Sequence, residues 1–177
     1  MLYIPLLYYQ LQEGDNTSLL DAIFRRRSIR RYKSEQVPDD VLRNILEAGR
    51  AAPSADNTQP WHFIILTDSK MKKKLASGFW NRFIENSAFT IVGCGEKGDA
   101  WSTVDVAIAL ENIVIAAEAQ GVGSCWIGDF REGDVKDLLG IPDDLKVVAL
   151  VSFGYPAEKP RPHGKKDLRK IIHYNKY

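Results

Sequence analysis

The chain has 177 residues, of which 45% are hydrophobic and 27% charged, values typical of one globular domain with its own core. Its formal net charge is +1. General binding to nucleic acid or to a membrane surface is thereby disfavoured, because either needs a clear excess of Lys and Arg, so any basic site must be local.

The chain begins with an apolar segment, Met1–Gln12. It is too short to cross a bilayer and lacks the basic start and small-residue cleavage site of a signal peptide. We interpret residues 1–16 as an N-terminal arm that packs on the body or on a partner chain, or as an extension from an upstream start codon. Residues 17–177 then form a single domain, since no repeat or low-complexity linker divides them.

Two helices are predicted early in the domain. Ser18 and Asp21 resemble a capping box that opens a helix over Leu19–Arg26. A second helix is expected over Asp39–Ala52, and Pro53 ends it. Its apolar stripe consists of Val41, Leu42, Ile45 and Leu46.

The middle of the chain is expected to alternate strands and helices. Trp61–Thr67 is predicted as a strand from its β-branched and aromatic residues, and Ala88–Gly93 as a buried strand. A solvent-facing helix is expected between them, over Met71–Phe83.

The most informative helix is predicted over Val104–Gln120. All but five of its residues are Ala, Ile, Val or Leu, so most of its circumference must be covered. A subunit interface would supply that cover, and so would a central position within a monomer. We predict the interface, because one small domain has difficulty covering such a helix alone.

The last third of the chain contributes two more strands and a helix. Ser124–Gly128 is predicted as a short strand, and Glu132–Leu139 as a helix ended by Gly140. Lys146–Phe153 alternates little, which indicates a strand buried on both faces. The tail from Lys159 onward is basic. Helices that interleave with strands indicate an α+β or α/β layered fold.

A basic cluster over Arg25–Tyr32 is the first candidate binding site. Its five arginines and Ser28 can hold a phosphate, because guanidinium groups offer forked donors and the hydroxyl adds another hydrogen bond. The alternative is a solvated basic helix end, favoured by the helix dipole.

A loop over Ala52–Trp61 is the second candidate. Asn57 and Gln59 carry donors and acceptors that suit the edge of a pyrimidine-like ring. The alternative is an ordinary turn rich in Pro, Ser and Asn. A third candidate is Gly121–Gly128, where glycines allow a backbone to approach a flat ligand closely.

Two other patterns are weaker. Gly93–Gly98 reads GxGxxG, but a dinucleotide site also needs an acidic residue near the end of the next strand, and Glu118 lies inside the long helix. We therefore expect a glycine-rich turn. Cys125 has no base beside it in sequence, so a catalytic cysteine is disfavoured.

No disulfide framework and no metal centre are expected. The two cysteines form no CxxC pair, and the three histidines show no metal-ligand spacing. Free thiols suit a reducing compartment, so the expected location is cytoplasmic.

Taken together, four blocks in this order resemble the nitroreductase family of FMN-dependent oxidoreductases, over about Ser18–Tyr177. The blocks are Arg26–Arg30, the loop Ala52–Trp61, the glycine-rich Gly121–Gly128, and Phe153–Pro156 before the basic tail. The resemblance implies an α+β fold: a mixed, mostly antiparallel sheet flanked by helices. It also implies an intertwined homodimer with two FMN sites at the interface, in which the C-terminal tail reaches across to the partner's sheet.

The resemblance assigns roles to residues. Arg26, Arg27 and Ser28 would face the FMN phosphate and ribityl chain, and Lys165 would take the place of a phosphate-binding Arg, with His163 near a second basic position. Arg30 would lie at the N1 and O2 edge of the ring, where a guanidinium stabilises reduced flavin.

Two further groups would contact the flavin ring. Pro53, Ser54 and Asn57, with Gln59 as a candidate beside them, would approach from the other subunit. Trp126, Ile127 and Gly128 would lie along the ring.

The implied activity is a ping-pong transfer of hydride or electrons from NAD(P)H to a small nitroaromatic or quinone acceptor. Chemistry on flavin N5 requires no catalytic side chain. Asp68–Ser102 is compact where larger relatives carry a helical excursion, so the acceptor does not transfer from the family. The choice among NADH, NADPH and ferredoxin also stays open.

Several alternatives use the same residues. Other flavin chemistry on this fold includes dehalogenation, enoate reduction and flavin fragmentation. A flavin-binding sensor without steady turnover is a second alternative. A non-flavin interaction module that uses the basic cluster is a third.

Overall fold

The computed structural model describes residues 19–76, 78 and 81–177. The predicted arm over residues 1–16, and Ser18 of the predicted capping box, lie outside the described residues. The elements are α1 Leu19–Arg25, α2 Asp39–Arg50, η2 Ala55–Asn57, β1 Trp61–Leu66, α3 Ser69–Leu75, η3 Arg82–Asn86, β2 Phe89–Glu96, α4 Ser102–Ala119, β3 Gly123–Ile127, α5 Glu132–Leu139, β4 Leu145–Gly154 and η4 Leu168–Lys170.

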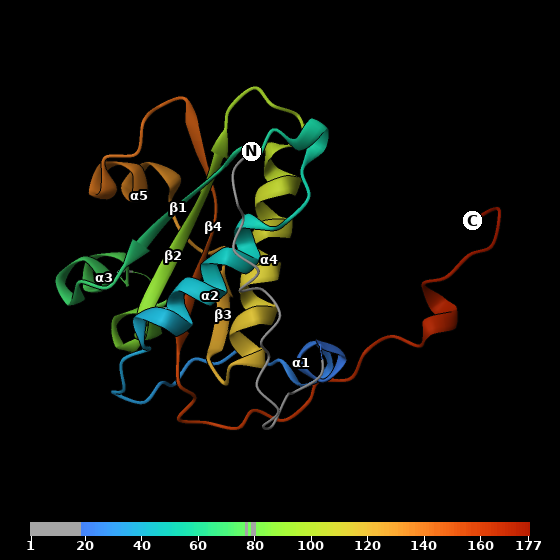
Figure 1. Ribbon diagram of the computed structural model, residues 1–177, viewed down its shortest axis with the longest axis horizontal. Helices are drawn as coiled ribbons and strands as arrows, with labels where there is room; N and C mark the ends of the chain where they lie inside the picture. Colours follow the sequence, from blue (N-terminus) through green and yellow to red (C-terminus); the bar gives the residue numbers. More distant parts are fainter. Residues whose placement is uncertain (1–18, 77, 79–80) are drawn as a thin grey trace, which may run out of the picture.

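A four-stranded sheet in the order β1-β2-β4-β3 forms the middle layer (Figure 1). Each neighbouring pair is antiparallel, and a single parallel bridge joins Ser28 to Ser124. Helices α2 and α4 pack on one face, around Ile91, Leu110 and Phe153, and α3, η3 and α5 cover the other. The predicted α+β fold, with a mostly antiparallel sheet flanked by helices, is confirmed.

Most predicted elements agree with the structure to within a few residues. Glu132–Leu139 has the predicted bounds, and Gly140 ends it in the left-handed region with φ 65°. The strand predicted over Lys146–Phe153 is β4, and its residues from Val147 onward are almost all buried, as expected.

The helix predicted over Met71–Phe83 is wrong in its extent. Asp68 caps α3 by accepting a hydrogen bond from the Met71 N–H at 2.8 Å, but the helix ends at Leu75, and η3 follows as a separate 3-10 turn. Gly78, in the gap between them, has low helix propensity. The helix is also not wholly solvent-facing. Lys72 is buried, and its Nζ donates to the carbonyls of Ser87 and Ala88; burial lowers the pKa of this amine.

The Gly93–Gly98 motif, predicted as a glycine-rich turn, is a turn only at its end. Gly93 and Gly95 lie within β2, and only Gly98, with φ 89°, has turn geometry. The strand glycines allow α4 to lie against the sheet. A Cβ at Gly93 would stand 2.7 Å from Leu110 Cδ1, and one at Gly95 would stand 2.2 Å from Ser102 Oγ.

Helix α4 is central to the fold of the single chain. It buries Val106, Leu110 and Ile113 completely, against α2 and the sheet. The central position therefore supplies most of its cover. Trp101 and Val104 nevertheless remain 58% and 44% exposed. The interface at α4 stays a prediction.

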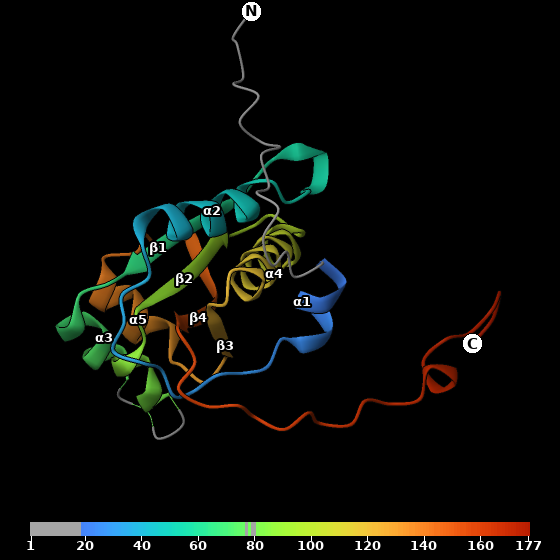
Figure 2. The same ribbon diagram turned by 60° about the horizontal axis from the view of Figure 1, so that its bottom comes forward.

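The C-terminal tail leaves the body after β4 and runs past α1 (Figure 2). Leu168 and the residues that follow it are exposed, and the tail contains only the short turn η4. The tail's predicted reach across a partner's sheet stays a prediction. Among the described residues, no helix has the length and apolarity needed to cross a membrane.

The close approach of α4 to β2 yields a test. Gly93→Ala should lower the free energy of unfolding by about 1–3 kcal/mol, because the new methyl group overlaps Leu110. Urea denaturation measures this value. Gly133→Ala in α5 is the control, since nothing lies within 4 Å of its Cβ position and alanine favours a helix. Equal stabilities for the two variants would contradict the packing described.

Candidate functional site

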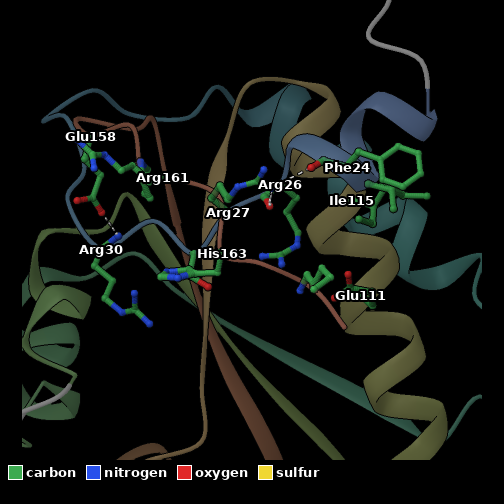
Figure 3. A pocket seen from close by; sticks show the side chains of 13 residues that line it. Phe24, Arg26, Arg27, Arg30, Glu111, Ile115, Glu158, Arg161 and His163 are labelled. Carbon is green, nitrogen blue, oxygen red and sulfur yellow. Dashed lines mark hydrogen bonds between the residues drawn. The ribbon is translucent and has the colours of Figure 1, made fainter. Parts of the chain in front are cut away.

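A cleft of about 760 Å³ lies between the end of α1, the middle of α4 and the first part of the C-terminal tail (Figure 3). Apolar residues of α1 and α4 line it, together with charged residues from the segment after α1, from α4 and from the tail. Its lining residues are Ile23, Phe24, Arg26, Arg27, Ser28, Arg30, Glu111, Ile115, Glu158, Pro160, Arg161, His163 and Lys165.

An extended segment after α1 forms one wall. Ser28 bridges Ser124 of β3, and Tyr32 bridges Pro156 just after β4. The Ile29 N–H donates to the Ser124 carbonyl at 2.9 Å, and the Lys33 N–H donates to Tyr155 at 2.9 Å. Segment 28–32 therefore lies across the ends of two strands, as a short extension of the sheet.

Buried side chains fix the orientation of this segment. The Tyr32 hydroxyl donates to the Ile29 carbonyl at 2.6 Å and lies 2.7 Å from Ser152 Oγ. Burial raises the pKa of Tyr32, so the hydroxyl stays protonated. Because Ile29 and Tyr32 point into the body, Ser28 and Arg30 are left to line the cleft.

Two strand glycines leave room for those buried side chains. A Cβ at Gly123 would stand 2.7 Å from Ile29 Cγ1, and one at Gly154 would stand 2.9 Å from the Tyr32 ring. Gly123 belongs to the glycine-rich block that the sequence singled out. Its observed role is close packing of backbone against the arginine segment.

The cleft carries more cations than carboxylates. Arg26 and Arg30 both line the cleft, and in the view of Figure 3 they lie on opposite sides of His163. Arg27 Nη1 donates to the carbonyls of Phe24 at 2.8 Å and Arg26 at 2.7 Å, which anchors this guanidinium at the end of α1. Arg30 also lies over the Phe83 ring, 5.9 Å from its centroid.

The arginines lie near two titratable groups, the half-buried Glu118 and the buried Cys125. Burial raises the pKa of Glu118, and the nearby Arg25, Arg26 and Arg27 oppose that shift. Burial also raises the pKa of the Cys125 thiol, so the unreactive protonated form is favoured at neutral pH.

A hydrogen bond to Glu111, a lining residue, holds the Trp126 side chain at the edge of the cleft. Its Nε1 donates to Glu111 Oε2 at 3.1 Å, and this joins the edge strand β3 to α4. Ile127 is 4% exposed and packs with the cluster on the opposite face of the sheet, so its side chain faces away. Gly128 follows β3 and is exposed.

The loop with Pro53, Ser54, Asn57 and Gln59 does not line this cleft. The Ala55 N–H donates to Asp105 Oδ2 at 3.2 Å, which places the loop near the start of α4. Asp105 precedes Glu111 of the cleft by roughly 9 Å along the helix. Within one chain, these four predicted residues and the arginine segment are therefore separate.

The backbone of that loop is strained. Asp56, Asn57 and Gln59 have φ of 48°, 56° and 53°, which are rare for residues other than glycine. The Gln59 N–H donates to Ser54 Oγ at 2.9 Å, and Gln59 Nε2 donates to the Asn57 carbonyl at 3.1 Å. Such strain, held by specific bonds, is concentrated at functional sites in proteins.

The structure therefore brings together Arg26, Arg27, Ser28, Arg30 and Lys165, with His163 beside them. The sequence interpretation missed Glu111, Glu158 and Arg161, and the apolar wall formed by Phe24 and its neighbours. Glu111 could have been found from the sequence, because a charged residue stands out within the largely apolar helix α4. Among the described residues, no group of His, Cys, Asp or Glu is arranged to hold a metal ion.

Comparison with known proteins gives concordant matches. A family model described as Nitroreductase family matches residues 23–88 and 78–155. A protein of Archaeoglobus fulgidus, whose name pairs NADH dehydrogenase with NAD(P)H nitroreductase, is 39% identical over 151 residues, which is 79% of this chain and 86% of that protein.

Solved structures are similar over most of the chain. The NADPH:FMN oxidoreductase of Vibrio harveyi, complexed with NAD+, superposes with a TM-score of 0.84 at 26% identity and covers 90% of this chain and 77% of its own. An FMN-dependent nitroreductase of Clostridium difficile gives a TM-score of 0.81 at 29% identity and covers 89% and 99%.

The buried tyrosine that orients the arginine segment can be tested alone. Tyr32→Phe should lower the free energy of unfolding by about 1–3 kcal/mol, because the Ile29 carbonyl loses a buried donor. Chemical denaturation is the measurement. Tyr174→Phe, at a side chain that is 85% exposed, is the matched control and should be neutral. An equally neutral Tyr32→Phe would show that this hydroxyl does not hold the segment.

Proposed function

The chain belongs to the nitroreductase family, and on that premise we propose that it is an FMN-dependent oxidoreductase. It passes hydride or electrons from NAD(P)H to a small electron-poor acceptor of the nitroaromatic or quinone type. The observation that carries the proposal is the convergence of Arg26, Ser28, Arg30 and Lys165, from opposite ends of the chain, on one cleft.

The cleft fits a phosphorylated ligand. Arg26, Arg161 and Lys165 offer charge-assisted donors from two walls, and the Ser28 hydroxyl adds another. The volume of about 760 Å³ lies within the range of small-molecule sites, roughly 300–1,000 Å³. Arg26, Arg27, Ser28 and Lys165 would hold the phosphate end.

The ring end would lie toward Arg30 and the end of β3. When bound, FMN supplies the hydride- and electron-transfer chemistry. The chain's part is orientation and charge: Arg30 keeps a cation at this end, which stabilises negative charge that develops there. Glu111 holds the indole of Trp126 at the edge of the cleft.

We infer the nicotinamide electron donor and the flavin cofactor from similar proteins. The similar protein of Vibrio harveyi is named for NADPH and FMN, and that of Clostridium difficile for FMN. We infer the same two ligand classes for this chain. The acceptor class rests on the family resemblance and on the open cleft.

We also infer a homodimer. Leu19, Leu20 and Phe24 on α1 are 67%, 63% and 71% exposed. Trp101, just before α4, and Val104 in its first turn are also exposed. Apolar exposure of this extent marks a protein–protein interface. A second copy would cover these residues, and its strained loop with Asn57 and Gln59 would complete the cleft that the same loop cannot reach within its own chain.

Arg26→Ala tests the phosphate end. We expect FMN affinity to fall by about 1.5–3 kcal/mol, or roughly 10- to 150-fold, as one charge-assisted bond is lost. Titration of apo-protein with FMN, followed by flavin fluorescence, gives the dissociation constant. Arg43→Ala removes the same charge from the exposed face of α2 and should leave it unchanged. If both variants bind FMN like the wild type, the phosphate lies elsewhere.

Reduction tests the activity itself. Anaerobic addition of NADH or NADPH to the FMN-loaded protein should bleach the visible flavin absorption, and a quinone or nitroaromatic should restore it. The absence of bleaching with both nucleotides would rule out a nicotinamide donor. Bleaching without recovery would redirect the search to other acceptors.

A further inference from the structure

Glu158 joins the two walls of the cleft. Its Oε1 accepts hydrogen bonds from the backbone N–H groups of Arg30 at 2.6 Å and Arg31 at 3.0 Å, and Oε2 accepts one from Arg31 Nε at 3.1 Å. The Glu158 side chain is 19% exposed. Figure 3 shows it at the cleft margin, bonded to the backbone of Arg30. Both carboxylate oxygens are engaged by the arginine segment.

The bonds fix the arginine wall. Two successive backbone N–H groups that meet one oxygen set the orientation of the peptide groups on either side of Arg30. Ile29 and Tyr32 are buried on the other side of the segment. The Arg30 side chain is therefore on the exposed side of the segment, where it borders the cleft and lies over the Phe83 ring.

The same residue anchors the tail wall. The Ala157 N–H donates to the Arg31 carbonyl at 2.9 Å, next to the three bonds of Glu158. Beyond Glu158, each hydrogen bond of the described tail, residues 159–177, stays within the tail. The positions of Arg161 and Lys165 over the cleft thus depend on where residues 157 and 158 are held.

Judged by its charge alone, Glu158 would weaken the binding of an anion in this cleft. The cleft gathers four arginines and a lysine, and a carboxylate among them opposes the binding of an anion. The N–H of Arg30, followed by the bonds to Arg31, lowers the pKa of Glu158, so the carboxylate is ionised at neutral pH. Its negative charge in a cation-rich site needs a compensating structural role.

We infer that Glu158 is a positioning residue for phosphate binding. It holds the start of the tail against the Arg30–Arg31 backbone, so that Arg161 and Lys165 of the tail converge with Arg26 on one anion. The inference rests on the proposed function for the identity of that anion, the FMN phosphate. Glu158 itself acts through the arginines and the tail, without contact to the reacting atoms.

Two substitutions separate positioning from simple charge. Glu158→Gln removes the charge, and Glu158→Asp keeps the charge but shortens the reach. Positioning predicts that both weaken FMN binding, by about tenfold, through lost alignment of charge-assisted bonds. A purely electrostatic role predicts tighter binding for Glu158→Gln and no change for Glu158→Asp. Glu96→Gln, the same charge change at the exposed end of β2, is the control and should bind FMN like the wild type.

Riboflavin distinguishes positioning from general destabilisation. It lacks the phosphate, so a misplaced phosphate site lowers FMN affinity much more than riboflavin affinity. A loss of overall structure lowers both alike. Circular dichroism and urea denaturation report the folded fraction of each variant. Arg31→Ala removes the bond to Oε2 from a residue outside the cleft lining, and it should weaken FMN binding in the same direction even if Glu158→Gln fails to fold.

The outcomes are distinct. Weaker FMN binding by Glu158→Asp and Arg31→Ala, with riboflavin binding little changed, supports the positioning role. A wild type that binds FMN, with Glu158 variants that bind it equally or more tightly, overturns that role and leaves the proposed function intact. A wild type that binds no FMN overturns the proposed function itself.

Discussion

The arginine segment can lie against the sheet only because two strand residues carry no side chain. Gly123 and Gly154 face Ile29 and Tyr32 at distances that a Cβ could not keep. Their absence of side chains lets the segment bond to β3 and to the chain after β4, with Ile29 and Tyr32 buried and Arg30 exposed. The chemistry of the cleft follows from this backbone contact, since the cations are placed by it.

Fixed cations are costly to assemble without a ligand, because like charges repel at short range. Hydrogen-bond acceptors along the arginine segment offset this cost. The carbonyl oxygens of Phe24 and Arg26 accept from the Arg27 guanidinium. The Glu158 carboxylate accepts from the backbone N–H groups of Arg30 and Arg31. Arg26 and Arg30 remain among the residues that line the cleft. The site is thus largely organised before a ligand arrives, and preorganised donors bind an anion at a smaller cost in ordering.

Sequence patterns predicted elements well where periodicity and capping agree, as in α5 and β4. They failed where a tertiary contact decides. Gly93 and Gly95 read as a turn because glycine is common in turns, yet here they serve the packing of α4 on β2. The grouping of the arginines with Ser28 could be anticipated, because these residues are adjacent in sequence and of types that bind phosphate, and they do line one cleft. Glu158 was not, since its partners lie more than a hundred positions away and are mostly backbone groups.

The predicted flavin-contacting residues of the loop after α2 lie outside the cleft. Asn57 and Gln59 are exposed, near the opposite end of α4 from Glu118 and held in left-handed conformations by Ser54 and by each other. Such strain clusters at functional sites, and within one copy the loop does not line the cleft. Apolar residues are exposed on α1, beside the cleft, and at the start of α4, near the loop. One second copy on that surface would bury the apolar residues and give the strained loop a ligand, so a single association would account for both features.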